Sequence, residues 1–182
     1  MKFKNRPNRC FNIDGEELWI SRSVTVLPVL LFVQQGGIFV PLNKRGQALP
    51  DEVGKWGLPG GYLDYDETAG EAVVREVWEE LGLDILTLQL EHTLKGSLEQ
   101  PTYVFSQPRH RQNVTLRFSL LFFLKSGTEL PVLDPQVGTD EVEDAQWFDL
   151  EAALGMSLSF RHEQVIRDCL ETDFKESLQA VR

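Results

Sequence analysis

Cysteine and long apolar runs are scarce in this sequence. Its 182 residues include two cysteines, Cys10 and Cys169, which lie far apart and form no C-x-x-C pair. Neither a zinc ribbon nor a dithiol redox centre is therefore expected. No apolar run approaches the roughly 20 residues of a membrane-spanning helix, so we expect no membrane partner. The basic start, MKFKNRPNRC, is followed by no apolar stretch, so we expect no secretory signal and a reducing, cytoplasmic setting.

Positive charge is also scarce. The chain carries 18 Lys and Arg against 28 Asp and Glu, a net charge of −10. A general basic surface for long nucleic acid is therefore not expected. A small anionic substrate stays compatible, because a bound metal and a few local basic residues offset the field. The sequence has no G-x-x-x-x-G-K-[ST] and no D-x-[DN]-x-[DN]-G segment, which argues against a P-loop kinase and an EF-hand.

The remaining pattern is that of an ordinary globular domain. Apolar residues make up 42% and charged residues 25%, and the length suffices for one core. Strands are predicted at 23–33, 38–44, 85–98, 103–105, 114–124 and 145–148, and helices at 69–81 and 160–178. This order predicts an α/β fold, with helices on the faces of a mixed sheet. Residues 1–21 are predicted to form an N-terminal extension, a flexible arm or a short strand and turn, before a domain at 22–182.

A helix with an acidic face is predicted between Thr68 and Gly82. Thr68 and Glu71 form a T-x-x-E capping box, and Gly82 suits the left-handed position after a helix end. The helix is therefore expected at about 69–81. Projected at 100° per residue, its apolar side chains share one arc, predicted to face the core: Val73, Val74, Val77, Trp78 and Leu81.

Three glutamates share the adjoining arc of this helix. Glu76 has like charges at Glu79 and Glu80, each pair costing roughly 0.2–0.5 kcal/mol. The latter two lie in the last turn, where the helix dipole disfavours anions by roughly 0.3–1 kcal/mol. A divalent cation removes both penalties. Oxygen ligands with no nearby His or Cys favour Mg²⁺ or Mn²⁺ over zinc, so the arc predicts such a site.

Residues 61–83, GYLDYDETAGEAVVREVWEELGL, resemble the Nudix box of the Nudix hydrolase family. The resemblance rests on the spacing of these residues: Gly61, Glu67, Arg75, Glu76, Glu79, Glu80 and Gly82. It implies an α/β/α sandwich and Mg²⁺ held by the three glutamates and the backbone carbonyl of Gly61. It also implies that Arg75 orients a box carboxylate, with Glu67 as its expected partner.

The implied reaction is hydrolysis of the diphosphate linkage in a nucleoside diphosphate derivative, such as ADP-ribose, a sugar nucleotide, a dinucleotide or a nucleoside triphosphate. Glu79 and Glu80 are the box candidates for the general base. Glu141 is a loop candidate for that role or for substrate contact, and a plain surface acid is the alternative. Arg109 and Arg111, in the basic loop SQPRHRQN, are substrate-contact candidates, against a solvated hairpin loop.

Two other questions stay open at the level of the sequence. A Nudix-fold sensor that binds a nucleotide or sugar nucleotide without cleaving it is the alternative function. The substrate subfamily is not assigned, because Leu98 stands where a proline is expected about 15 residues beyond the box in many ADP-ribose enzymes. A homodimer is expected only from the habit of the family.

Overall fold

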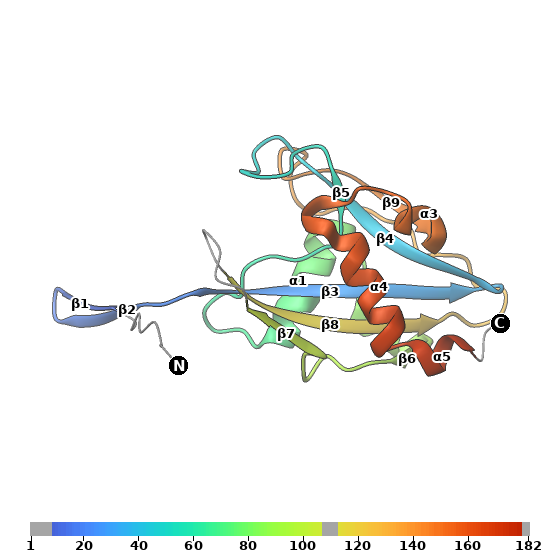
Figure 1. Cartoon of the computed structure of the whole chain (residues 1–182), viewed down its shortest axis with the longest axis horizontal. Helices are drawn as coiled ribbons and strands as arrows, with labels where there is room; N and C mark the ends of the chain where they lie inside the picture. Colours follow the sequence, from blue (N-terminus) through green and yellow to red (C-terminus); the bar gives the residue numbers. More distant parts are fainter. Residues whose placement is uncertain (1–8, 107–112, 180–182) are drawn as a thin grey trace, which may run out of the picture.

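The described residues are built around a seven-stranded mixed sheet. Figure 1 shows that helices lie on both faces of this sheet. The computed structural model describes residues 9–106 and 113–179. The strands of this sheet are β3 (Ser23–Gln34), β4 (Gly37–Arg45), β5 (Trp56–Gly57), β6 (Thr93–Lys95), β7 (Tyr103–Ser106), β8 (Asn113–Phe123) and β9 (Val142–Asp149). Strand β3 lies at the centre, parallel to β8 and antiparallel to β4. The predicted α/β sandwich is confirmed.

The helices divide between the two faces of the sheet. They are α1 (Ala69–Leu81), α2 (Ile85–Glu91), α3 (Leu150–Leu154), α4 (His162–Thr172) and α5 (Lys175–Gln179), with a 3₁₀ turn, η1 (Ser159–Arg161), before α4. Side chains of β3 alternate between two apolar clusters, as expected for a buried strand. Leu30 and Phe32 pack with the residues of α1 and α2, whereas Leu31 packs with those of α3 and α4. The two clusters lie on opposite faces of the sheet, so α1 and the box glutamates that it carries lie on one face.

Helix α1 has the boundaries predicted for it. The Thr68 side chain accepts from the Glu71 backbone, and the Glu71 side chain accepts from the Thr68 backbone. Gly82 ends the helix with φ of 69°, the left-handed conformation that glycine adopts without strain. Both ends are thus set by contacts within a few residues.

Three details differ from the predictions. The segment predicted as a strand at 85–98 is instead α2 followed by the short β6, because the Asp84 side chain caps a helix by accepting from Thr87 N. The C-terminal helix breaks after Thr172 and resumes at Lys175. Trp78, predicted to face the core, is 46% exposed, because it lies beside a surface groove rather than against the sheet.

A separate two-stranded ribbon precedes the sheet. Strands β1 (Arg9–Ile13) and β2 (Glu16–Ile20) pair with each other in an antiparallel hairpin. They fall within the segment predicted as an extension, and their turn is at Asp14 and Gly15. In the described ranges, no helix has both the length and the apolar character needed to cross a membrane.

Candidate active site

Arg75 connects the acidic residues of α1 to the loop before it. Its Nε donates to Glu67 Oε2 at 3.0 Å, and its Nη2 donates to Glu67 Oε1 at 2.7 Å and to Tyr62 O at 2.9 Å. Its Nη1 donates to Glu76 Oε1 at 2.8 Å and to Glu79 Oε2 at 3.0 Å. All five N–H donors of the guanidinium are thereby used, and these contacts raise the pKa of Arg75, with the bonds to Glu67 the largest cause.

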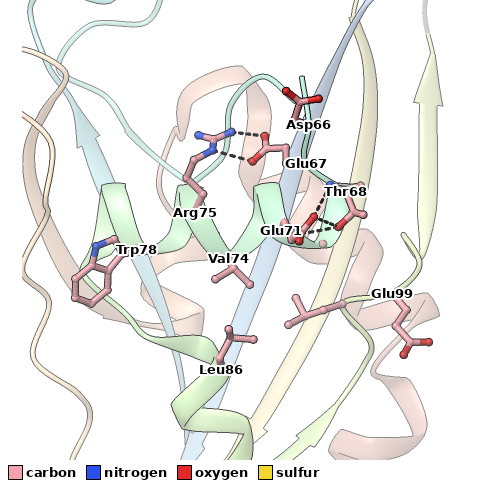
Figure 2. A pocket seen from close by; sticks show the side chains of 12 residues that line it. Asp66, Glu67, Thr68, Glu71, Val74, Arg75, Trp78, Leu86 and Glu99 are labelled. Atoms are coloured by element: carbon pink, nitrogen blue, oxygen red, sulfur yellow. Dashed lines mark hydrogen bonds and ion pairs between the residues drawn. The ribbon is translucent and has the colours of Figure 1, made fainter. Parts of the chain in front are cut away.

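Glu67 is fixed from both sides. It follows the turn before α1, and its Oε1 accepts from Asp64 N at 2.8 Å in addition to Arg75. The hydrogen bonds from Arg75 hold the pKa of the Glu67 carboxyl below its usual range. Figure 2 shows the two side chains meeting in a paired contact above the first turns of the helix. A fork-like pair of this kind fixes the orientation of both partners.

Glu76 and Glu80 are buried carboxylates on one side of α1, each 8% exposed. Burial raises the pKa of Glu76 above its usual range, and the carboxylates of Glu79 and Glu141 add to this rise. Burial raises the pKa of Glu80 to about 8, and Glu76 and Glu141 again contribute. The negative charges of these two carboxylates are therefore not fully offset by nearby positive charge, even though Arg75 contacts Glu76.

The glycines before the helix allow the chain to lie directly against these carboxylates. Gly60 N donates to Glu80 Oε2 at 2.9 Å. A Cβ on Gly61 would come within 2.4 Å of Glu76 Oε1, so a larger residue there would displace that carboxylate. The carbonyl oxygen of Gly61 accepts from Val26 N at 2.9 Å, which ties it to β3 and leaves its second lone pair available.

Glu141 reaches the same cluster from a distant part of the chain. Strand β9 pairs with β4 so that Val142 lies opposite Arg45, and Gly46 N donates to Glu141 O at 2.8 Å. Glu141 is itself exposed, but its charge acts on both Glu76 and Glu80. The structure thus brings Glu141 to the carboxylates of α1. Arg109 and Arg111 lie outside the described residues.

Three residues not singled out from the sequence lie next to this cluster. Arg45, at the end of β4, interacts electrostatically with Glu80, and its guanidinium lies 4.9 Å from the centroid of the Phe160 ring. Phe160 is 52% exposed and adopts a positive φ of 51°, which is rare for a bulky residue. His162 is buried, and its Nδ1 accepts from Leu58 N at 2.9 Å. An isolated Arg, Phe or His gives no local signal, so only the fold reveals these positions.

An open groove of about 880 Å³ adjoins the cluster on the outer side of α1 (Figure 2). It shares Glu67 and Arg75 with the carboxylate cluster. Val74, Trp78 and Leu86 supply apolar walls. The groove accounts for the exposure of Trp78.

Comparison with known families finds one match that spans both the sheet and the acidic helix α1. The family model described as NUDIX domain matches residues 22–169. The chain belongs to the Nudix hydrolase family. This Nudix chain is 29% identical over 143 residues to the RNA pyrophosphohydrolase of Acidiphilium cryptum, covering 76% of this chain and 84% of that protein. It is 34% identical over 116 residues to the ADP-ribose pyrophosphatase of Methanocaldococcus jannaschii, covering 63% and 57% of the two chains.

Solved structures agree with this assignment. The NUDIX domain of Shewanella oneidensis NrtR, complexed with ADP ribose, aligns with a TM-score of 0.63 at 24% identity, over 84% of this chain and 88% of that one. At that identity the likeness concerns the fold. The enzyme class predicted from the box is confirmed by relatives that carry the names of hydrolases and pyrophosphatases.

Proposed function

We propose that this Nudix chain is a Mg²⁺- or Mn²⁺-dependent pyrophosphohydrolase that cleaves the diphosphate linkage of a nucleoside diphosphate derivative. The observation that carries the proposal is the burial of Glu80 and Glu76 beside Glu141, on a helix anchored by Arg75. Buried carboxylates so close together are costly as anions. A divalent cation is the partner that makes such a cluster favourable.

The residues present fit a hard cation in their chemistry. Glu76, Glu79, Glu80 and the carbonyl of Gly61 are the oxygen ligands that would hold it. Among the residues that the structure describes, no three acidic, His or Cys side chains converge as one set of ligands. Arg75 Nη1 donates to one oxygen of Glu76 and to one oxygen of Glu79. Each carboxylate has a second oxygen outside this contact that would ligate the cation, while the contacts with Glu67 keep Arg75 in place.

Hydrolysis at this site needs a water, a proton acceptor and contacts to the phosphates. When bound, the cation offsets phosphate charge and acidifies a water. In the proposed cleavage, a water attacks one phosphorus atom, and the bond from this atom to the bridging oxygen breaks, which leaves that oxygen on the other phosphate. The proton passes to a carboxylate at the site, for which Glu79, Glu80 and Glu141 are the candidates. Arg45, beside Glu80, is placed to bind phosphate oxygens.

Phe160 is proposed to bind the nucleoside end of the substrate. Its ring is half exposed and lies beside Arg45, so a base stacked on it would sit next to the phosphate contacts. Arg161, the next residue, also has a positive φ, of 61°. Backbone strain of about 1–3 kcal/mol per residue persists only where the surrounding structure enforces it, and it concentrates at functional sites.

A substrate panel tests the proposal. Purified protein would be incubated with Mg²⁺ or Mn²⁺ and with ADP-ribose, sugar nucleotides, dinucleotides, nucleoside triphosphates and a short 5′-triphosphate RNA. Products would be resolved by chromatography. Metal-dependent cleavage of at least one compound is expected. Uniform inactivity together with retained nucleotide binding would contradict the proposal and favour the non-catalytic sensor.

Matched variants locate the chemistry in the same assay. Glu79→Gln, Glu80→Gln and Glu141→Gln each remove one candidate proton acceptor with little change of shape. Loss of a metal ligand or proton acceptor is expected to lower kcat by roughly 10²-fold or more. Glu151→Gln, on the exposed side of α3, is the control and is expected to keep full turnover.

A further inference from the structure

The segment 57–61 passes from one face of the sheet to the other at the candidate site. We call it the crossing segment. Leu58 packs in the apolar cluster of α3 and α4, on one face. Gly60, two residues later, donates from N to Glu80 Oε2 at 2.9 Å, on the face that carries α1. The position of the crossing segment therefore determines where the carbonyl of Gly61, a proposed ligand, lies relative to the carboxylates of α1.

His162, the first residue of α4, contacts the crossing segment from the side opposite α1. Its Nδ1 accepts from Leu58 N at 2.9 Å, and the two residues are 8% and 4% exposed. Strand β5 ends at Gly57, so Leu58 N lies just beyond the last residue of that strand. A buried N–H without an acceptor is costly. The imidazole thus supplies an acceptor at the point where the strand has ended.

Glycines allow the crossing segment to lie directly against its surroundings. A Cβ on Gly57 would overlap with Ser159 Oγ and would lie 3.2 Å from His162 Nδ1. Gly60 has a φ of 144°, and a Cβ there would overlap with Val26 O. The segment is therefore confined by η1 and α4 at one end and by β3 at the other.

The turn that leads into α4 places His162 against the crossing segment. Phe160 and Arg161 have φ of 51° and 61°, so two consecutive residues other than glycine adopt the left-handed conformation. Such conformations persist only where the surrounding structure enforces them. The same turn sets the Phe160 ring against Arg45. One strained turn therefore positions both the proposed nucleoside contact and the imidazole that holds Leu58.

The hydrogen bond to Leu58 also fixes the tautomer of His162. A ring nitrogen that accepts a hydrogen bond carries no proton, so the neutral imidazole carries its proton on Nε2. Burial lowers the pKa of His162 to about 4, so the ring is neutral at pH 7. The contact is therefore one between a neutral acceptor and a backbone donor.

We propose that His162 is a positioning residue for the metal site. Through Leu58, it holds the crossing segment so that Gly60 N and the carbonyl of Gly61 stay aligned with the carboxylates of α1. This role rests on the proposed function, because the alignment matters for catalysis only if a cation binds there. The alternative is that His162 only fills space between α4 and the sheet.

Two variants separate the hydrogen bond from packing. In His162→Asn, the amide oxygen takes the position of Nδ1 and can accept from Leu58 N, although the side chain is smaller. In His162→Leu, the volume is kept and the acceptor is lost. Positioning predicts that Asn is the better replacement, whereas packing alone predicts that Leu is. His92→Leu is the control, because His92 Nδ1 accepts from Lys125 N at 3.4 Å outside the site.

Mn²⁺ binding, followed by the electron paramagnetic resonance signal of the free ion, measures the effect without substrate. His162→Leu is expected to bind Mn²⁺ about 10-fold more weakly than the wild type, as for loss of other groups that orient metal ligands. His162→Asn and His92→Leu are expected to bind like the wild type. In the cleavage assay, His162→Leu should lower kcat and need more Mg²⁺, with little change in KM. Equal Mn²⁺ affinity of His162→Leu and the wild type would overturn the proposal.

Nuclear magnetic resonance tests the contact itself in the absence of metal. At pH 7, the ¹⁵N shifts of wild-type His162 are expected to show a proton on Nε2 and none on Nδ1. The Gly60 amide should exchange with solvent faster in His162→Leu than in the wild type and His162→Asn. A proton on Nδ1, or equal exchange in all three proteins, would overturn the proposal. A wild type that binds no Mn²⁺ and cleaves no compound would instead overturn the proposed function, and the two resonance measurements would still decide whether His162 holds the segment.

Discussion

Arg75 and Glu67 form a two-point contact, through Nε at 3.0 Å and Nη2 at 2.7 Å. The remaining donors of Arg75 reach Tyr62 O, Glu76 and Glu79. One side chain therefore joins the loop before α1 to two of the carboxylates on it. The orientations of Glu67, Glu76 and Glu79 therefore depend in part on a single guanidinium.

Arg75→Lys is expected to lower turnover while the protein still folds. A single ammonium cannot reproduce the paired contact with Glu67 and also reach Glu76 and Glu79. Loss of a group that orients metal ligands typically costs 10- to 100-fold in activity or metal affinity. Steady-state kinetics with a Mg²⁺ titration measures this. Wild-type kinetics in Arg75→Lys would show that charge alone is sufficient at this position.

Gly61→Ala is expected to disturb the site by contact with one carboxylate. The added Cβ would lie 2.4 Å from Glu76 Oε1, so the carboxylate must move. We expect activity to fall by about 10-fold or more, with a higher Mg²⁺ requirement. Gly155→Ala is the control, because its Cβ would approach no other atom closer than 3.4 Å. Equal activity of the two variants would rule out the steric argument.

His162 is expected to make stability depend on pH. Burial lowers its pKa from 6.5 to about 4, so the folded protein keeps it neutral while the unfolded chain protonates. Between these values the unfolded state binds more protons, so stability is full above pH 6.5 and decreases as pH falls towards 4. The loss reaches about 3 kcal/mol.

Urea unfolding from pH 7 to pH 4.5 measures this effect. Other groups titrate in the same range, so the informative quantity is the difference from His162→Asn, which should lack this part of the slope. His92→Asn retains His162 and should follow the wild type. A His162→Asn profile parallel to the wild type would contradict the assignment.

Phe160→Ala is expected to raise KM for substrates with an aromatic base. Stacking on an aromatic side chain contributes about 1–3 kcal/mol per base, which corresponds to roughly 5- to 150-fold in binding. Phe160→Tyr keeps the ring and should restore KM. Both variants would be compared on the best substrate of the panel and on a diphosphate that lacks a base. A similar change for both compounds would exclude a stacking role.

Local contacts made α1 predictable from the sequence. Its ends depend on Thr68, Glu71 and Gly82, which act on backbone groups a few residues away. The 3.6-residue period also predicted the burial of Val73, Val77 and Leu81, all 0% exposed. Trp78 lies on the same arc, but burial there depends on what packs outside the helix, and a groove adjoins it.

Contacts between distant segments could not be predicted in this way. Arg45 and Glu141 meet at the carboxylates because β4 pairs with β9, a register that no local pattern specifies. His162 supports the loop before the box from a helix that follows it by 104 residues. The apolar residues at 85–98 suited a strand or a helix, and the Asp84 cap selected the helix. The acidic residues of α1 were thus evident in the sequence and Glu141 was a candidate there, whereas Arg45 and His162 were not.

The most direct measurement of the central claim is the initial rate of diphosphate cleavage as a function of Mg²⁺ for the wild type and Glu80→Gln. Glu80 is a buried carboxylate of the cluster, and burial raises its pKa to about 8. The account predicts saturable activation of the wild type by Mg²⁺ and a kcat at least roughly 10²-fold lower in Glu80→Gln at every concentration. Cleavage that is independent of Mg²⁺, or equal in the two proteins, would contradict it.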